Sequence, residues 1–142
     1  MAKPRLSKNN HALILLIVGL LGWLIPGAGF FFLNEKKRAI IIFVTLLLTF
    51  GAGLYIGSIG VIDPYGSWPW YIAQVMTSPL VMILGHYVSA GGFPVYGKPA
   101  EIGQIYTGIA GLLNLLCIIK SVYLAHLYRI ETDGGQKNVS DD

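Results

Sequence analysis

"GWLIPGAGFFFLNEKKRAIIIF", residues 22–43, interrupts an apolar run with Pro-Gly, resumes with three phenylalanines and then meets three consecutive basic residues. Proline removes a backbone donor and clashes with the preceding turn of a helix, and the nearby Gly27 and Gly29 have no side chains that resist bending. We therefore expect a helix break at Pro26. The helix before the break, residues 11–25, is about 22 Å long, which is short for a membrane crossing.

The composition of the 142-residue chain is that of a membrane protein. Hydrophobic residues make up 54% and charged residues 12%, about half the charged share of soluble domains. Four uncharged stretches remain between the charges, residues 12–33, 39–62, 70–90 and 102–119. As helices they are roughly 27 to 36 Å long, close to the thickness of the hydrocarbon core. The sequence predicts an all-α membrane protein, a bundle of four apolar helical segments with the first broken at Pro26 and the third at Pro79.

The chain is expected to form one membrane-embedded helical domain, residues 1–130. The polar tail that follows, residues 131–142, has almost nothing to bury and is predicted to be disordered. The net charge of +3 does not indicate a nucleic-acid partner, because the basic residues are few and form no patch with interleaved aromatic residues. The bilayer is the expected partner.

The distribution of the ten Lys and Arg residues allows two arrangements of the first stretch. Basic residues concentrate on the cytoplasmic side, so Lys36, Lys37 and Arg38 are taken as topology-determining. If the first and third stretches turn back at Pro26 and Pro79 as half-inserted hairpins, every basic residue except Lys98 is cytoplasmic. The alternative is a broken but complete first crossing, because re-entrant backbone survives in a membrane only when other protein shields its polar groups. The sequence leaves both open.

Small residues at four-residue spacing predict two helix-packing faces, because close approach of backbones drives association in lipid. The second stretch carries Thr45, Thr49, Gly53 and Gly57. The fourth carries Gly103, Thr107 and Gly111, followed by Asn114, Ser121 and Ala125 along nearly the same face. We expect the two faces to meet. A homodimer through either face is the alternative.

Asn114 is the polar residue most deeply placed in an apolar stretch. An unpaired amide there costs on the order of 1 to 3 kcal/mol, so we expect a bond to Thr49 or to a carbonyl freed at Pro26. The main interpretation of Asn114 is a structural bond. The other is a ligand or ion site near Pro26, Asn114 and His86. A separate interpretation makes His86 an axial ligand of a haem or chlorophyll-type pigment, and the alternative to it is that His86 anchors its helix at the interface.

The sequence contains no motif that indicates catalysis or a metal. The three histidines lie in different segments, and there is no nucleophile elbow, phosphate-binding glycine loop or metal-ligand spacing. Cys117 stands alone in the last apolar stretch. We therefore expect neither an enzyme nor a bound cofactor or metal.

Residues 22–43 resemble the Pro-Gly-x-Gly, aromatic cluster, basic turn and second helix of small bacterial membrane proteins related to the two-transmembrane-helix domain family. "EIGQIYTGIAGLLNLLCIIKSVYLAH", residues 101–126, is similar to the closing helix of an uncharacterised bacterial family that begins with such a segment. The chain departs from this pattern where residues 30–34, Phe-Phe-Phe-Leu-Asn, replace the usual His, Tyr and Leu-Gly. The resemblance implies a multi-pass inner-membrane protein and no particular reaction.

The sequence thus favours a non-enzymatic integral protein of the bacterial inner (cytoplasmic) membrane. Its expected role is that of an accessory or assembly subunit that packs against other membrane proteins or against itself. The alternative is a membrane protein that handles a small molecule or ion at the polar site near Pro26, Asn114 and His86.

Overall fold

The computed structural model describes residues 11–66, 68–92 and 97–137, and all regular secondary structure within them is helical. The elements are α1 His11–Leu24, α2 Ala28–Phe32, α3 Lys36–Gly57, the short 3-10 helix η2 Ile59–Val61, α4 Trp68–Val75, α5 Leu80–Gly91 and α6 Lys98–Lys137. The prediction of an all-α bundle is confirmed. So are the two breaks, because α1 ends just before Pro26 and α5 begins directly after Pro79.

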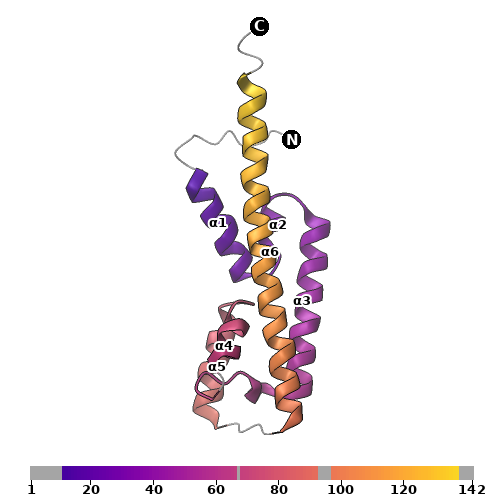
Figure 1. The fold of residues 1–142 in the computed structure, drawn as a ribbon, viewed down its shortest axis with the longest axis vertical. Helices are drawn as coiled ribbons and strands as arrows, with labels where there is room; N and C mark the ends of the chain where they lie inside the picture. Colours follow the sequence, from indigo (N-terminus) through magenta and orange to yellow (C-terminus); the bar gives the residue numbers. More distant parts are fainter. Residues whose placement is uncertain (1–10, 67, 93–96, 138–142) are drawn as a thin grey trace.

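Helix α6 is the axis of the molecule, and the other elements pack along it (Figure 1). Helix α3 runs antiparallel beside α6, α1 and α2 lie against its middle and upper part, and α4 and α5 lie toward its lower end. Each of the two short pairs is a hairpin, since the chain turns back after α1 and again after α4. The path of the chain therefore follows the first of the two arrangements that the sequence left open, with hairpins that approach each other from opposite ends.

The turn after α1 depends on both Pro26 and Gly27. Pro26 has no N–H to continue the helix. Gly27 follows with a left-handed backbone, φ 84°, and a methyl group added to it would lie 2.7 Å from the carbonyl oxygen of Ala39. A residue with a side chain would therefore be strained by its backbone angle and would also collide with α3.

Helices α3 and α6 approach most closely where both lack side chains. A methyl group added to Gly103 would lie 2.7 Å from the Cα atom of Gly57 and 2.8 Å from the carbonyl oxygen of Gly53. One added to Gly53 would lie 2.7 Å from Cγ2 of Thr107. Backbones in such contact gain dispersion energy that larger residues would prevent.

Two helices are long and apolar enough to cross a membrane, Lys36–Gly57 and Lys98–Tyr128. Residues 12–24 and 80–91 form shorter apolar helices. Of the four apolar segments predicted as membrane helices, only the second and fourth thus have the length of a full crossing, because the breaks at Pro26 and Pro79 divide the other two.

The last helix is longer than the sequence suggested. It continues to Lys137 and so includes the first part of the tail, residues 131–142, that we predicted to be disordered. Adding one residue to an existing helix needs no new nucleus, which allows a polar segment to remain helical. Residues 138–142 lie outside the described residues.

Candidate functional site

The polar centre of the bundle is the amide of Asn114. The residue is fully buried, 0% exposed, and its Nδ2 donates to the carbonyl oxygens of Gly22 at 3.2 Å, Met76 at 3.0 Å and Thr77 at 2.9 Å. Gly22 belongs to the first hairpin, and Met76 and Thr77 belong to the turn of the second. One side chain on α6 therefore ties together both hairpins. We call these four residues the Asn114 clasp.

The clasp uses a carbonyl that the first proline leaves free. In a continuous helix the oxygen of Gly22 would accept from the N–H four residues later, but that residue is Pro26. The expectation that Asn114 bonds to a carbonyl freed at Pro26 is thus confirmed. Thr49, the other expected partner, donates instead to the carbonyl of Thr45 in its own helix at 2.8 Å.

The second proline leaves a matching carbonyl, that of Val75, four residues before Pro79. It accepts from Nε1 of Trp23 at 3.0 Å. In addition, Oγ of Ser78 donates to the carbonyl of Leu24 at 3.1 Å. The tips of the two hairpins therefore satisfy each other's backbone groups, which an apolar surrounding requires.

One helical turn away from the clasp, Gln74 joins α4 to α6. It is 0% exposed, and its Nε2 donates to Oγ1 of Thr107 at 2.8 Å and to the carbonyl of Val61 at 3.3 Å. The sequence analysis missed Gln74, Trp23 and Ser78. The signal that could have found Gln74 is its position as a lone amide within the uncharged stretch 70–90.

Three buried oxygen atoms near the contact of α4 and α6 have no hydrogen-bond partner among the described residues: Oε1 of Gln74, Oγ1 of Thr77 and Oδ1 of Asn114. The gap beside Asn114 that is bordered by Gly22, Gly29 and Ser121 is too narrow for a water molecule. The polar centre therefore consists of direct contacts between helices. None of its side chains is titratable, so what it does chemically is hold backbone carbonyls.

The predicted packing residues divide into three groups. Gly53, Gly57, Gly103 and Thr107 lie together at the contact of α3 and α6. Gly111 lies against the carbonyl of Ala73 on α4 rather than against α3, and Asn114 belongs to the clasp. Thr45 is exposed, and Thr49 is half-buried with its hydroxyl bonded within α3.

The break residues also contact other helices. Gly29 lies so near α6 that an added methyl group would be 2.5 Å from Oγ of Ser121, while Gly27 lies on Ala39 of α3. Pro26 and the two glycines therefore set the position of the hairpin between α3 and α6 as well as its turn.

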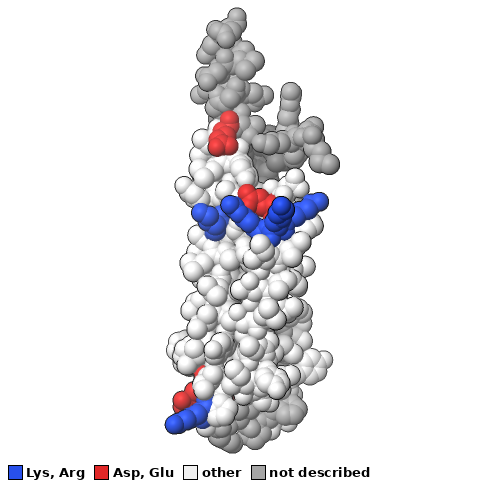
Figure 2. Space-filling model, turned by 90° about the vertical axis from the view of Figure 1, so that its right-hand side faces the viewer, with Lys and Arg blue, Asp and Glu red and all other residues white. Residues whose placement is uncertain are grey.

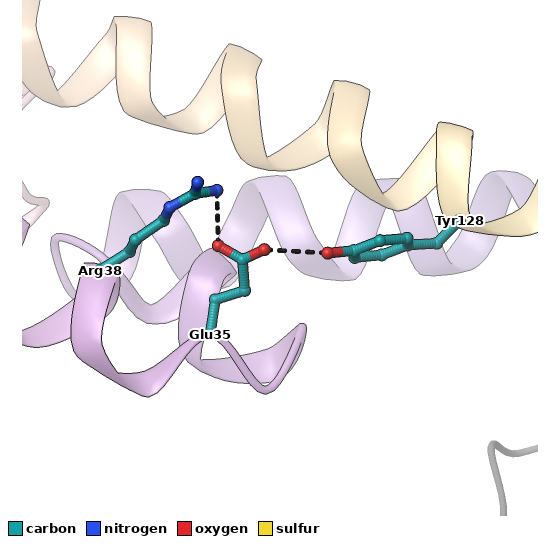
Figure 3. Close-up of polar contacts among 3 residues, drawn as sticks. All are labelled: Glu35, Arg38 and Tyr128. Carbon is teal, nitrogen blue, oxygen red and sulfur yellow. Dashed lines mark hydrogen bonds and ion pairs between the residues drawn. The ribbon is translucent and has the colours of Figure 1, made fainter.

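Lys36, Lys37 and Arg38, which the sequence predicts to determine topology, form the first turn of α3. Nη1 of Arg38 lies 2.7 Å from Oε2 of Glu35, and the hydroxyl of Tyr128 on α6 donates to Oε1 of the same carboxylate at 2.8 Å (Figure 3). Gly57 of α3 and Gly103 of α6 are in contact. Arg38 on α3 and Lys120 on α6 lie at nearly the same distance from this contact along the two antiparallel helices. The first turn of α3 therefore lies near the level of Lys120. In Figure 2 the basic residues form a band at this level, and a long uncharged surface separates it from the charges at the far end.

Residues 17–132 match the model of a family of unknown function, DUF6677. The chain belongs to the DUF6677 family. No curated protein and no solved structure matches it. The region shared with DUF6677 begins within α1 and ends within α6, so it contains most of the first hairpin, the whole second hairpin and all four residues of the Asn114 clasp. The relation to the two-transmembrane-helix domain family that the resemblance suggested stays a prediction.

His86 lies apart from the clasp in this DUF6677 protein. It is exposed on α5, its ring 6.4 Å from that of the neighbouring Tyr87, and α5 packs on α4 through the contact of Gly85 with the ring of Tyr71. Of the three residues of the polar site predicted from the sequence, the structure brings together only Pro26 and Asn114, and His86 lies elsewhere. Within residues 11–66, 68–92 and 97–137, His, Cys, Asp and Glu form no group of three that could hold a metal ion.

Proposed function

We propose that the chain is a non-enzymatic integral membrane protein of the bacterial inner (cytoplasmic) membrane, in which α3 and α6 cross the bilayer. Support comes from the uncharged surface between the basic band and the far end. Along α6 this zone extends from Glu101 to Lys120, about 29 Å at the helical rise of about 1.5 Å per residue, against a hydrocarbon core of about 30 Å.

The two hairpins enter from opposite sides and end within the protein. A re-entrant hairpin needs partners for its backbone groups. The bonds of Asn114 to Gly22, of Trp23 to Val75 and of Ser78 to Leu24 supply them. This removes the main objection to a half-inserted first segment.

The end that carries the basic band faces the cytoplasm. In the part of the chain that the structure describes, Lys36, Lys37, Arg38, Lys120, Arg129 and Lys137 belong to that end, and only Lys98 belongs to the other. The opposite end has exposed aromatic residues that suit the headgroup region, among them Tyr55, Tyr65 and Trp68.

The role we propose is that of an accessory or assembly subunit that packs against another membrane protein or a second copy of itself. The observation that carries this proposal is an apolar surface at the level of the basic band. A methyl group added to Gly19 of α1 would lie 3.5 Å from Val122, two residues after Lys120, so the part of α1 before Gly19 lies at the level of the band. There Leu13 is 60% and Leu16 66% exposed. At the level of the headgroups acyl chains cover leucines poorly, whereas a partner protein would bury them.

A photo-crosslinking amino acid placed at Leu16 tests this role in intact cells. The matched control is Leu48 on α3, which is equally exposed, 67%, but lies within the uncharged zone. We expect a protein adduct from position 16 and lipid adducts alone from position 48. Lipid adducts alone at both positions would refute the proposed role.

A further inference from the structure

The corner between α2 and α3 forms an open groove of about 470 Å³, lined by Asn34, Glu35, Lys36, Lys37 and Arg38. Asn34 makes the corner with a left-handed backbone, φ 64°. The groove lies in the basic band, at the level where we propose that the headgroups of the cytoplasmic leaflet begin.

The one carboxylate of the groove is already engaged. Both oxygens of Glu35 have partners, the guanidinium of Arg38 and the hydroxyl of Tyr128 (Figure 3). Lys36 and Lys37 are both exposed, and among the described residues no acidic side chain lies within ion-pair distance of either ammonium group. The groove therefore presents uncompensated positive charge to the membrane surface.

Exposed apolar side chains stand on both helices next to the groove. Phe31 and Phe32 on α2, and Ile40 and Ile41 on α3, are all more than half exposed. The Nζ atom of Lys36 lies 6.0 Å from the centre of the Phe31 ring, so charged and apolar surfaces adjoin directly. A ligand that suits both has a negative headgroup and hydrocarbon chains.

We propose that this groove binds an anionic phospholipid, with the phosphate at Lys36 and Lys37 and an acyl chain along Phe31 and Ile40. The inference rests on the proposed function, since it requires that α3 crosses the bilayer with this end at the cytoplasmic surface. Of the two sources of a phosphate group, a lipid and the free anion, the adjoining phenylalanines and isoleucines favour the lipid.

The test uses the full chain in nanodiscs of phosphatidylcholine with phosphatidylglycerol, and native mass spectrometry of the phosphatidylglycerol that stays bound after release from the discs. Each lysine near a membrane surface contributes roughly fivefold to anionic-lipid affinity, so the double variant Lys36→Gln, Lys37→Gln should bind about 25-fold more weakly. Lys98→Gln, an exposed lysine at the other end, should bind as the unaltered chain does. The double variant Lys36→Arg, Lys37→Arg keeps the charge and should bind normally, which separates lost charge from misfolding.

Four results would overturn the inference. They are equal binding by the Gln double variant, an equal loss in Lys98→Gln, loss of binding in the Arg double variant, and displacement of the lipid by inorganic phosphate at low concentration, which would assign the groove to the free anion. A chain that enters the discs but shows no preference for phosphatidylglycerol refutes only the lipid site. A chain that does not enter them refutes the membrane proposal as well.

Discussion

Replacement of Asn114 by Leu should destabilise the bundle more than any change to an exposed polar residue. Leucine has nearly the same shape as asparagine, so the substitution removes the amide while it preserves packing. It leaves the carbonyls of Gly22, Met76 and Thr77 without the donor that serves them. The backbone groups of both hairpin tips then lack a partner in an apolar surrounding.

The size of the effect follows from the three bonds. A hydrogen bond between membrane helices contributes about 0.6 kcal/mol on average and at most about 1.7 kcal/mol, which gives a range of about 2 to 5 kcal/mol for three. The amide has only two hydrogens for three carbonyls, and the variant also loses the unpartnered Oδ1 atom. We therefore expect the lower end, a decrease of about 2 kcal/mol in the free energy of unfolding.

Reversible unfolding by SDS in mixed micelles, followed by circular dichroism, measures this decrease. The matched control is Thr49→Val, because Thr49 bonds only to a carbonyl of its own helix and its loss should change stability by less than about 0.5 kcal/mol. If Asn114→Leu proves as stable as Thr49→Val, the clasp does not hold the hairpins and the reasoning fails.

Three further substitutions test individual contacts by the same unfolding measurement. Gly103→Ala should destabilise by about 1 to 3 kcal/mol because it forces α3 and α6 apart, whereas Gly51→Ala, with open space around it, should be neutral or stabilising by up to about 1 kcal/mol; equal effects would refute the close contact. Gly27→Ala should cost at least about 1 to 2 kcal/mol for its left-handed backbone alone, and a neutral result would show that the turn is not left-handed. Trp23→Phe removes the bond to Val75 and should cost about 1 kcal/mol; an unchanged stability would mean that another donor serves this carbonyl.

The features that the sequence predicted correctly depend on local chemistry. Proline cannot continue a helix, so the breaks at Pro26 and Pro79 could be placed from the residues alone. The need of a buried amide for a partner likewise predicted a bond from Asn114 to Thr49 or to a carbonyl that Pro26 frees, and the structure shows the second of these, at Gly22. These inferences needed no knowledge of which helices are neighbours.

The burial of the predicted packing series of α3 changes along the helix for a geometric reason. A four-residue spacing advances about 40° beyond a full turn at each step, since a helix has about 3.6 residues per turn. The series therefore winds around the helix, from the exposed Thr45 through the half-buried Thr49 to Gly53 and Gly57 at the contact with α6. The buried positions Ala39, Leu46 and Gly53 follow the seven-residue spacing, which drifts much less.

The bonds between the two hairpins could not be predicted, because nothing in the sequence indicates that the two hairpin tips meet. Trp23 and Ser78 look like ordinary members of apolar stretches until the hairpins are known to meet. Only the position of the two tips on α6 reveals which carbonyls need which donors.

Accessibility of single cysteines in intact cells tests the central claim, that the uncharged zone lies in the bilayer with both hairpins turned back. Cysteines at Ala12, Asn34, Gly66 and Gly97, each in a chain with Cys117→Ser, would be treated with a membrane-impermeant maleimide. We expect positions 66 and 97 to react from outside, and positions 12 and 34 to react only after the membrane is opened. Reaction of positions 12 and 34 from opposite sides would contradict the hairpin at Pro26, and recovery of the folded chain without detergent from the soluble fraction would contradict the membrane assignment itself.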